Sequence, residues 1–344
     1  MQVRELRNGD QALWDQYVRC SELSTPYHLS GWKDVLQDVF CSETHYLLAE
    51  ENNKIVGVLP LLHIKSILTG HYFTSLPGGL CAESEQAAEA LMDQGKELVK
   101  ATKARYLILR DGRKKWNFPG LVTDEEHITF IVELDQDLEK VKGDFKKRTR
   151  QLVNQATRSG LVSATGLENL AEYYPIYAQA MRELGTPTLG FVFFKSLANH
   201  LPDETNLLTV YLDSRIVGGG FMAPFKETVY CTWAGMLREY YPLHSVHLLV
   251  WNSITYAFNN GFQRVDLGRC RKNSGAYVFK KDFGANCMQL YQQCYLNGTK
   301  APPSVGAAME DDPTYRTFVK IWRKLPLQMT EFIGPKLRRR VPFG

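Results

Sequence analysis

Two stretches of the chain alternate apolar runs with a short polar turn, a pattern typical of β-hairpins. Residues 46–64 contain two apolar segments separated by the polar turn at 51–54. Residues 207–225 repeat this arrangement, with the turn at 213–215. Because apolar segments on both sides of a short polar turn favour antiparallel pairing, each stretch predicts two adjacent strands.

The two hairpins begin two copies of a longer pattern. The triplet Ile-Val-Gly at 55–57 recurs 161 residues later at 216–218. Apolar residues at helical spacing then predict helices at 85–102 and 247–259, and Gly261 is the expected stop of the second helix. A short strand follows each helix, at 106–110 and 264–269. The sequence therefore predicts a tandem repeat, and its unit resembles the core of the GCN5-related N-acetyltransferases (GNAT).

The length of the chain also favours two domains. With 344 residues, 44% of them hydrophobic, the chain exceeds the usual size of one domain. The polar stretch 135–160 reads as the connection, so we expect a first GNAT-like domain at 1–139, a second at 140–300 and a basic tail at 301–344. The expected fold class is α/β (α+β), with mixed central sheets flanked by helices.

Composition excludes few functions, but it indicates the compartment in which the protein works. Charge is nearly balanced, with 41 Lys and Arg against 37 Asp and Glu, so net charge does not argue for nucleic acid or membrane binding. The seven cysteines form no C-x-x-C pair, which indicates reduced thiols, most of them small buried residues. The first 20 residues lack signal-peptide features and no segment is apolar enough to span a bilayer. We expect a cytoplasmic protein.

Histidines do not indicate a catalytic or metal site. His244 and His247 are three residues apart, but no third ligand lies nearby in the sequence, so a packing role is favoured. The other six histidines are scattered. We therefore predict no metal.

The richest chemistry lies at residues 266–285, DLGRCRKNSGAYVFKKDFGA. Ligands of open α/β sheets bind beyond the carboxyl ends of strands, and this segment follows the strand that ends near Leu267. The alternative is an ordinary solvated loop anchored by aromatic residues. A second basic segment, residues 144–160, reads either as a solvated helix face or as an anion site for a nucleotide-linked, lipid-linked or RNA-borne phosphate.

Three phrases give a family resemblance. FKKRTRQLVNQATRSGLV, MRELGTPTLGFVFF and VDLGRCRKNSGAYVFKKDFGA resemble the FemAB peptidoglycan aminoacyltransferases. Among these, the chain is most similar to the subgroup associated with exosortase/PEP-CTERM exopolysaccharide systems. Phrases in the first half, such as IVGVLPLLHIKS and SLPGG, fit as well.

The resemblance implies transfer of an acyl or aminoacyl group to an amine, without a metal or a bound cofactor. It assigns Lys280 to the reacting carbonyl, where an ammonium can stabilise an oxyanion, with Phe279 as its aromatic neighbour. Asp266 either accepts a proton or braces Arg269. The remaining substrate-binding candidates, for anions or the acceptor, are Tyr277, Arg269, Arg148 and Arg182, and Arg182 is alternatively a helix cap.

Two departures leave the donor open. The stretch LREYYPLHSVH, where acetyl-CoA enzymes carry a glycine-rich turn, contains no glycine, and the Gly78-Gly79 pair of the first half is expected to serve chain reversal. Several FemAB enzymes also carry a long helical arm associated with tRNA, and residues 160–297 contain no extended heptad run. The expected co-substrate is therefore an activated acyl donor, aminoacyl-tRNA or acyl-CoA, and the acceptor an amine of a peptidoglycan or exopolysaccharide precursor, nucleotide-linked or lipid-linked. The alternatives are a non-catalytic precursor-binding module and an acetyl-CoA-dependent N-acetyltransferase.

The tail is basic, with eight Lys or Arg residues against Glu331 alone between 313 and 344. One interpretation is peripheral contact with the inner face of the cytoplasmic membrane, since cations interleave with apolar residues. The other is a helix that packs on the first domain. The sequence leaves the oligomeric state undetermined.

Overall fold

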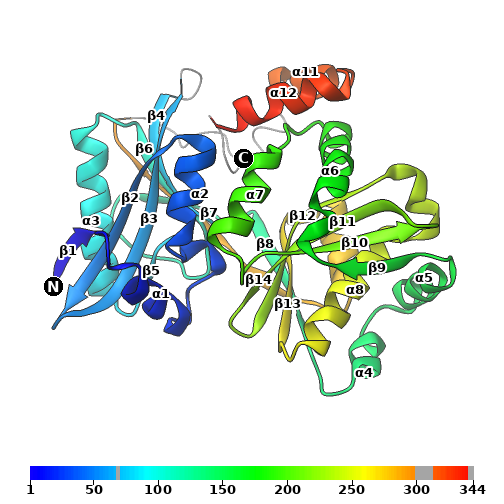
Figure 1. The fold of residues 1–344 in the computed structure, drawn as a ribbon. Coiled ribbons are helices and arrows are strands. Elements are labelled where there is room, and N and C mark those ends of the chain that lie inside the picture. Colours follow the sequence, from blue (N-terminus) through cyan, green and yellow to red (C-terminus); the bar gives the residue numbers. More distant parts are fainter. Residues whose placement is uncertain (67–69, 299–312, 340–344) are drawn as a thin grey trace. The chain divides into compact units, whose positions relative to one another are not determined.

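The computed structural model describes residues 1–66, 70–298 and 313–339. It divides into two compact units, each with its own sheet. Within the described residues the first unit comprises 1–127, 289–298 and 338–339, and the second comprises 128–288 and 313–337. Figure 1 shows the helices and strands of both units.

The first unit is built on a sheet with strand order β1-β2-β3-β4-β6-β15-β7, and β5 pairs with β3. Its elements are β1 (Gln2–Glu5), α1 (Gln11–Cys20), α2 (Gly31–Phe40), β2 (Glu43–Glu51), β3 (Lys54–Ser66), β4 (Gly70–Ser75), β5 (Cys81–Ala82), α3 (Glu85–Ala101), β6 (Tyr106–Gly112), β7 (Leu121–Asp124) and β15 (Tyr291–Leu296). Alternate residues of β2 face opposite ways: Leu47 belongs to the core under α3, while Tyr46 contacts Trp14 of α1. Helices therefore cover both faces of the sheet.

The second unit has the strand order β14-β8-β13-β12-β11-β10-β9. Its strands are β8 (His127–Glu133), β9 (Val162–Thr165), β10 (Asn206–Leu212), β11 (Arg215–Phe225), β12 (Thr228–Met236), β13 (Arg264–Arg271) and β14 (Asn286–Gln289). Its helices are α4 (Leu138–Gly143), α5 (Lys147–Arg158), α6 (Leu170–Leu184), α7 (Phe191–His200), α8 (Ser245–Asn259), α9 (Gly275–Lys281), α11 (Pro313–Trp322) and α12 (Leu327–Arg338).

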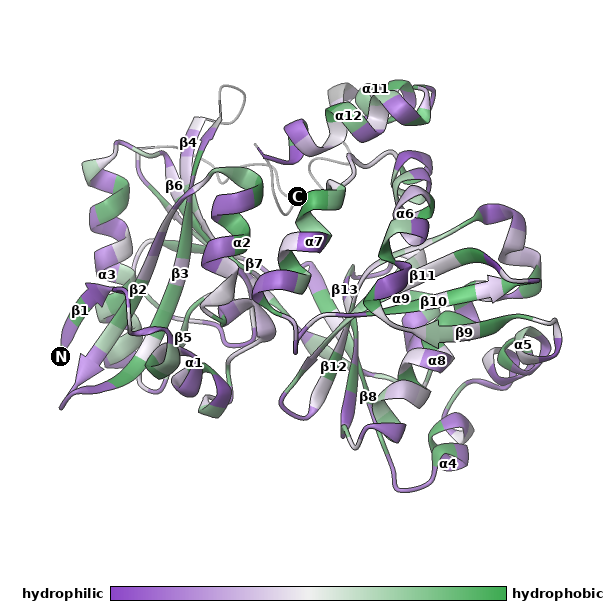
Figure 2. Cartoon of the chain, viewed as in Figure 1, coloured by the Kyte–Doolittle hydropathy of each residue, from purple (hydrophilic) through white to green (hydrophobic). Residues whose placement is uncertain are grey.

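Helices α5 and α8 contribute Val153 and Ile254 to the main core of this unit. On β11, Phe221 packs against Tyr173 of α6 and Phe194 of α7. Figure 2 shows the sheet strands carrying many of the hydrophobic residues, and the helices combining hydrophobic and hydrophilic ones.

The predicted repeat is confirmed. Both hairpins are present, β2-β3 and β10-β11, and each is closed by two residues with positive φ, Asn52 and Asn53 in one and Asp213 and Ser214 in the other. Two consecutive left-handed residues are the requirement of a type I′ turn, for which Asn and Asp are suited. In each unit a helix then leads to a strand parallel to the last strand of the meander: β4 pairs with β6, and β12 with β13.

The division of the chain differs from the predicted boundaries at 140 and 300. Strand β8 already lies in the second sheet, beside β13, so the second unit begins near Ile128. Strand β15 returns to the first sheet, between β6 and β7. These shifts arise because strand pairing, and not position along the chain, decides which core a segment joins.

The tail from residue 313 to 337 groups with the second unit, whereas residues 338–339 group with the first. Arg323, just after α11, donates to the carbonyl of Leu184 at 3.1 Å, and Arg182 donates to the carbonyl of Leu325 at 3.5 Å. Trp322 is only 2% exposed. The loop after α6 therefore provides the surface on which these helices pack.

Candidate functional site

The end of β13 forms a tight, buried turn in the second unit. Asp266 is 4% exposed, and its Oδ1 accepts hydrogen bonds from the backbone N–H of Gly268 at 2.8 Å and from the hydroxyl of Thr129 on β8. Gly268 has φ +81°, which a residue with a side chain adopts only with strain. A Cβ at this position would also lie 3.0 Å from the carbonyl oxygen of Cys231. The Asp266-x-Gly268 turn thus ties the end of β13 to β8, its neighbour on the other side.

Helix α9 directs Lys280 back onto this turn. The side chain of Ser274 caps the helix by accepting from the N–H of Tyr277 at 3.2 Å. One and a half turns later, Nζ of Lys280 donates to the carbonyls of Gly268 at 2.6 Å and Arg269 at 3.1 Å. Burial lowers the pKa of Lys280, although nearby Cys270, Asp266 and Cys231 oppose this effect. An ammonium carries three donors, so one remains after these two hydrogen bonds.

The two strands beside Lys280 pair only briefly. Strands β12 and β13 are in parallel register from Thr228 and Arg264 to Tyr230 and Asp266. Beyond that point, residues 231–234 of β12 are at least partly exposed, although β12 lies inside the sheet. The backbone of β12 is also irregular there, because Trp233 has φ +39° and the register with β11 shifts. A central strand that parts from its neighbour leaves backbone groups available to a ligand.

The equivalent place in the first unit is filled by its own chain. Strands β4 and β6 are paired at Thr74 and Ile108, and the turn 76–79 follows β4. Gly78 donates its N–H to the carbonyl of Arg110 at 2.9 Å, which closes the strand end. The prediction that Gly78 and Gly79 serve chain reversal is confirmed, since both have positive φ in this turn. Only the second unit therefore places an ammonium at the parted strands, within the described residues.

The basic segment and the C-terminal part of the motif meet in space. Lys146 donates its backbone N–H to the carbonyl of Asp282 at 2.9 Å, and its Nζ lies 2.6 Å from the Asp282 carboxylate. The ring of Phe145 packs 5.1 Å from that of Phe283. The N-terminus of α5, with its exposed cations Lys146, Lys147 and Arg148, is thus fixed beside α9.

His247 links Arg148 to the aromatic part of the motif. Its ring centroid lies 5.1 Å from that of Phe279. Burial, with smaller contributions from His244 and Arg148, lowers the pKa of His247 to about 4. His247 is therefore neutral at pH 7, and the charge at this end of α8 comes from Arg148.

The structure brings most of the predicted site residues together, but their contacts differ from one residue to the next. Lys280, Asp266 and Arg269 meet at the end of β13. Phe279 packs against His247 and Phe283, toward the core, so its neighbours are protein side chains.

Tyr277 packs edge-to-face on Phe130 with a centroid distance of 5.2 Å. Arg148 lies close enough to His247 for its charge to affect the pKa of that ring, and His247 in turn packs on Phe279. Arg182 instead donates to Leu325, next to the C-terminal helices.

Sequence reasoning missed Thr129, Cys231 and His247 as parts of this site. Thr129 precedes Asp266 by 137 residues and reaches it only because β8 pairs beside β13. Cys231 contributes the carbonyl that faces Gly268, and burial raises the pKa of its thiol to about 12. His247 is predicted to be a packing residue, which is what the ring contacts show. In the sequence, the only indications that His247 lies near the motif are the predicted helix start at 247 and the run of aromatic residues at 277–283.

Comparisons with known proteins identify the fold. The acetyltransferase (GNAT) domain family matches residues 142–281. A crystal structure of FemX superposes with a TM-score of 0.70 at 16% identity, covering 86% of this chain and 98% of that one. The chain folds as two GNAT-like domains in tandem. The GNAT match covers the segment that contains both α5 and Lys280.

Two further solved structures are similar in fold to this chain. The C-terminal domain of a putative lysylphosphatidylglycerol synthetase from Agrobacterium fabrum has a TM-score of 0.59 at 12% identity, covering 84% of this chain and 92% of that one. A tandem GNAT protein from the clavulanic acid biosynthesis pathway has a TM-score of 0.55 at 11% identity, covering 85% and 97%. No curated protein matches the chain by sequence.

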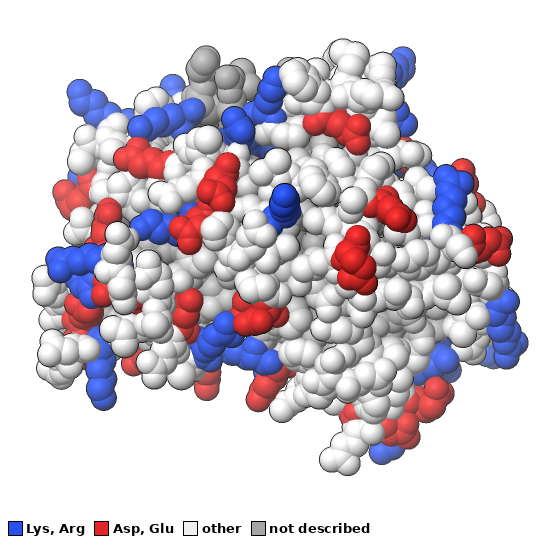
Figure 3. Space-filling model, in the orientation of Figure 1, with Lys and Arg blue, Asp and Glu red and all other residues white. Residues whose placement is uncertain are grey.

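Among the described residues, no helix combines the length and apolar character needed to cross a bilayer. On the face shown in Figure 3, cationic and anionic side chains are interspersed. Because the described residues form no separate cationic patch on this face, the candidate anion site rests on Lys146, Lys147 and Arg148, which lie next to α9.

Proposed function

We propose that this protein is an acyltransferase that moves an acyl or aminoacyl group from an activated donor to an amine of a cell-envelope precursor. The observation that carries the proposal is the ammonium of Lys280. It is held on the carbonyls of Gly268 and Arg269 beside the parted ends of β12 and β13, with one donor left over. The similarity to FemX and to a lysylphosphatidylglycerol synthetase supports an envelope component as acceptor.

We expect Lys280 to stabilise the negative charge that develops during the reaction. When the amine attacks the donor carbonyl, a C–N bond forms and the carbonyl oxygen becomes negative. The free N–H of Lys280 donates to this oxygen, and its low-dielectric surroundings strengthen the interaction. The bond to the leaving oxygen or sulfur then breaks, and the proton lost by the amine neutralises the leaving group. Asp266 positions the turn, because its hydrogen bonds with Gly268 and Thr129 hold these residues in place.

The cations at the start of α5 suit the anionic part of a substrate. Arg148 is exposed and its neighbour His247 is neutral, so the local field is positive at pH 7. Phosphates of a nucleotide, a lipid carrier or a tRNA would bind there through charge-assisted hydrogen bonds. The loop between β12 and α8 contains no glycine, which favours an aminoacyl ester over CoA as donor.

The decisive experiment compares Lys280→Ala with Lys281→Ala. Both residues lie on α9, but Lys281 is exposed and stands 5.9 Å from the ring of Tyr277. Peptidoglycan and exopolysaccharide precursors are incubated with aminoacyl-tRNA or acyl-CoA, and products are followed by mass spectrometry. We expect Lys280→Ala to lose about 10²- to 10³-fold in turnover, as for removal of an oxyanion donor.

Lys281→Ala should retain wild-type turnover. Undiminished product formation by Lys280→Ala would overturn the assignment. Binding of a precursor by the wild-type protein without product from any donor would overturn the enzymatic proposal in favour of a binding module. A thermal shift caused by CoA, and not by aminoacyl-tRNA, would identify the donor as an acyl-CoA.

A further inference from the structure

The first unit contains a cluster of two imidazoles and a carboxylate that plays no part in the proposed chemistry. Glu43 and His45 are two residues apart on β2, so their side chains lie on the same face of the sheet. His63 on β3 is the direct cross-strand partner of Glu43. Register alone therefore gathers the three side chains on the face that also carries Leu47 and Leu59.

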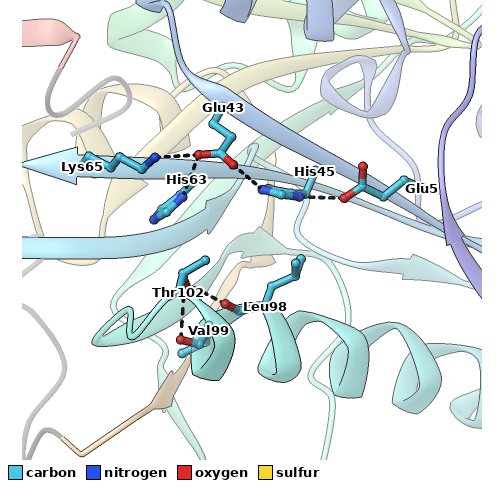
Figure 4. A network of polar contacts seen from close by, with 8 residues as sticks. All are labelled: Glu5, Glu43, His45, His63, Lys65, Leu98, Val99 and Thr102. Atoms are coloured by element: carbon cyan, nitrogen blue, oxygen red, sulfur yellow. Dashed lines mark hydrogen bonds and ion pairs between the residues drawn. The ribbon is translucent and has the colours of Figure 1, made fainter.

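Glu43 lies at the centre of this cluster, as Figure 4 shows. Its Oε1 is 3.5 Å from Nε2 of His45, and its Oε2 is 3.2 Å from Nδ1 of His63. One ligand atom from each of the three residues lies within 4.8 Å of the others. Lys65 also reaches Oε2 of Glu43, at 2.8 Å, but its side chain is 57% exposed.

A buried phenylalanine fixes both imidazoles. The ring of Phe73 stacks on His63 at a centroid distance of 4.4 Å and meets His45 edge-on at 5.6 Å. The His63 side chain is 3% exposed and that of His45 is 15% exposed. Nε2 is buried in both rings and makes no hydrogen bond with the protein. Buried nitrogens without partners are uncommon, and a bound ion is one regular explanation for Nε2 of His45, which faces Glu43.

The other nitrogen of His45 indicates what its Nε2 needs. Nδ1 of His45 lies 2.7 Å from the carboxylate of Glu5, which accepts its proton. In a neutral imidazole this leaves a lone pair on Nε2, directed at the negative Oε1 of Glu43. Two acceptors that face each other across 3.5 Å attract a cation between them. A carboxylate behind a histidine ligand is also the usual outer partner in zinc sites.

We propose that Glu43, His45 and His63 form a binding site for a divalent transition-metal ion of the zinc class. Zinc bonds of about 2.0–2.2 Å place tetrahedral ligand atoms roughly 3.3–3.5 Å apart. Each carboxylate oxygen of Glu43 lies at about this distance from one imidazole nitrogen: Oε1 is 3.5 Å from Nε2 of His45, and Oε2 is 3.2 Å from Nδ1 of His63. The ion would displace the exposed ammonium of Lys65 and link β2 to β3, which makes it a structural site independent of the proposed acyl transfer.

Zinc binding to the full chain, prepared without a histidine tag, tests this site. Bound metal is counted by mass spectrometry of dialysed protein, and affinity is measured by competition with a chromogenic chelator. We expect one zinc ion per chain. His45→Gln and Glu43→Gln should each weaken binding by at least about 100-fold, and Glu5→Gln by about 10- to 100-fold because it acts through His45.

The matched control is His200→Gln, which removes an exposed histidine of the second unit. It should leave the affinity unchanged. X-ray absorption of the zinc-loaded wild-type protein should show two imidazole ligands, and this measurement does not depend on any variant folding. No stoichiometric zinc in the wild-type protein, wild-type affinity in His45→Gln, or fewer than two imidazoles in the spectrum would each overturn the proposal.

Discussion

At the scale of single residues, two glycines of the same motif have opposite requirements. Gly268 has φ +81° and faces the carbonyl of Cys231, whereas a Cβ added to Gly275, at the start of α9, would meet no atom within 4 Å. The first glycine is needed for its backbone conformation, and the second is not. Stability measurements can separate these cases.

Gly268→Ala should lower the free energy of unfolding by about 1–3 kcal/mol, from left-handed strain and the contact with Cys231. Gly275→Ala should raise it by a few tenths to about 1 kcal/mol, because alanine favours the helix and reduces the entropy of the unfolded chain. Urea denaturation of both variants measures the difference. Equal effects of the two substitutions would contradict this account of the turn.

His247 should make stability fall in acid. Its pKa is about 4 in the folded protein and about 6.5 when unfolded, so between these values the unfolded chain binds a proton that the folded chain does not. The free energy of unfolding therefore decreases as pH falls from 6.5 to 4. Allowing for solvent screening of a half-buried ring, the decrease is about 1–2 kcal/mol.

Denaturation midpoints of the wild-type protein and of His247→Gln at several pH values test this slope. Protonation of carboxylates changes stability in both proteins, so only the difference between the two curves reports on His247. Parallel curves between pH 4 and 6.5 would show that the ring is protonated without cost.

At the scale of elements, the site depends on strand β8 next to β13. Thr129 of β8 donates to Asp266, so Thr129→Val leaves this buried carboxylate with one fewer donor. We expect a loss of about 1–3 kcal/mol in unfolding free energy. Thr165→Val on the exposed edge strand β9 is the control and should change stability by less than about 0.5 kcal/mol. If Thr129→Val is as stable as this control, the hydrogen bond from Thr129 does not contribute to holding Asp266.

Elements with a strong local pattern were predictable from the sequence. The hairpins follow from apolar runs around Asn52-Asn53 and Asp213-Ser214, whose conformations these residues favour locally. Helix α8 and its end at Gly261, with φ +75°, follow equally from periodicity and turn chemistry. The motif around Lys280 was recognised because its residues are contiguous.

Contacts between distant segments were not predictable. The pairing of Thr129 with Asp266 and the return of β15 to the first sheet depend on strand order. No local pattern specifies these. Arg182 stays a prediction for substrate binding, and in the structure its side chain donates to the carbonyl of Leu325.

At the scale of the whole molecule, the first unit depends on a strand from the far end of the chain. Strand β15 lies between β6 and β7 and buries Cys294. Its Gln293 also hydrogen-bonds the backbone of Trp116 in both directions, at 2.9 and 2.6 Å. Without β15, β7 has no partner in this sheet among the described residues.

A chain ending at residue 288 should therefore have an unstable first unit, while a chain ending at residue 298 should keep it. Both lack α11 and α12, so loss of those helices affects them equally. Limited proteolysis followed by mass spectrometry should show cleavage within residues 1–127 only in the shorter chain. Protection of that region in both chains would show that the first sheet does not need β15.

The position of β15 has a consequence during translation. The ribosome completes every strand of the second sheet before it has made the residue that closes the first. The first sheet therefore cannot be completed until β15 has been made, because in the described sheet β6 and β7 pair only through it. By then every strand of the second sheet has been synthesised. The half that is made first is expected to be the last to become stable.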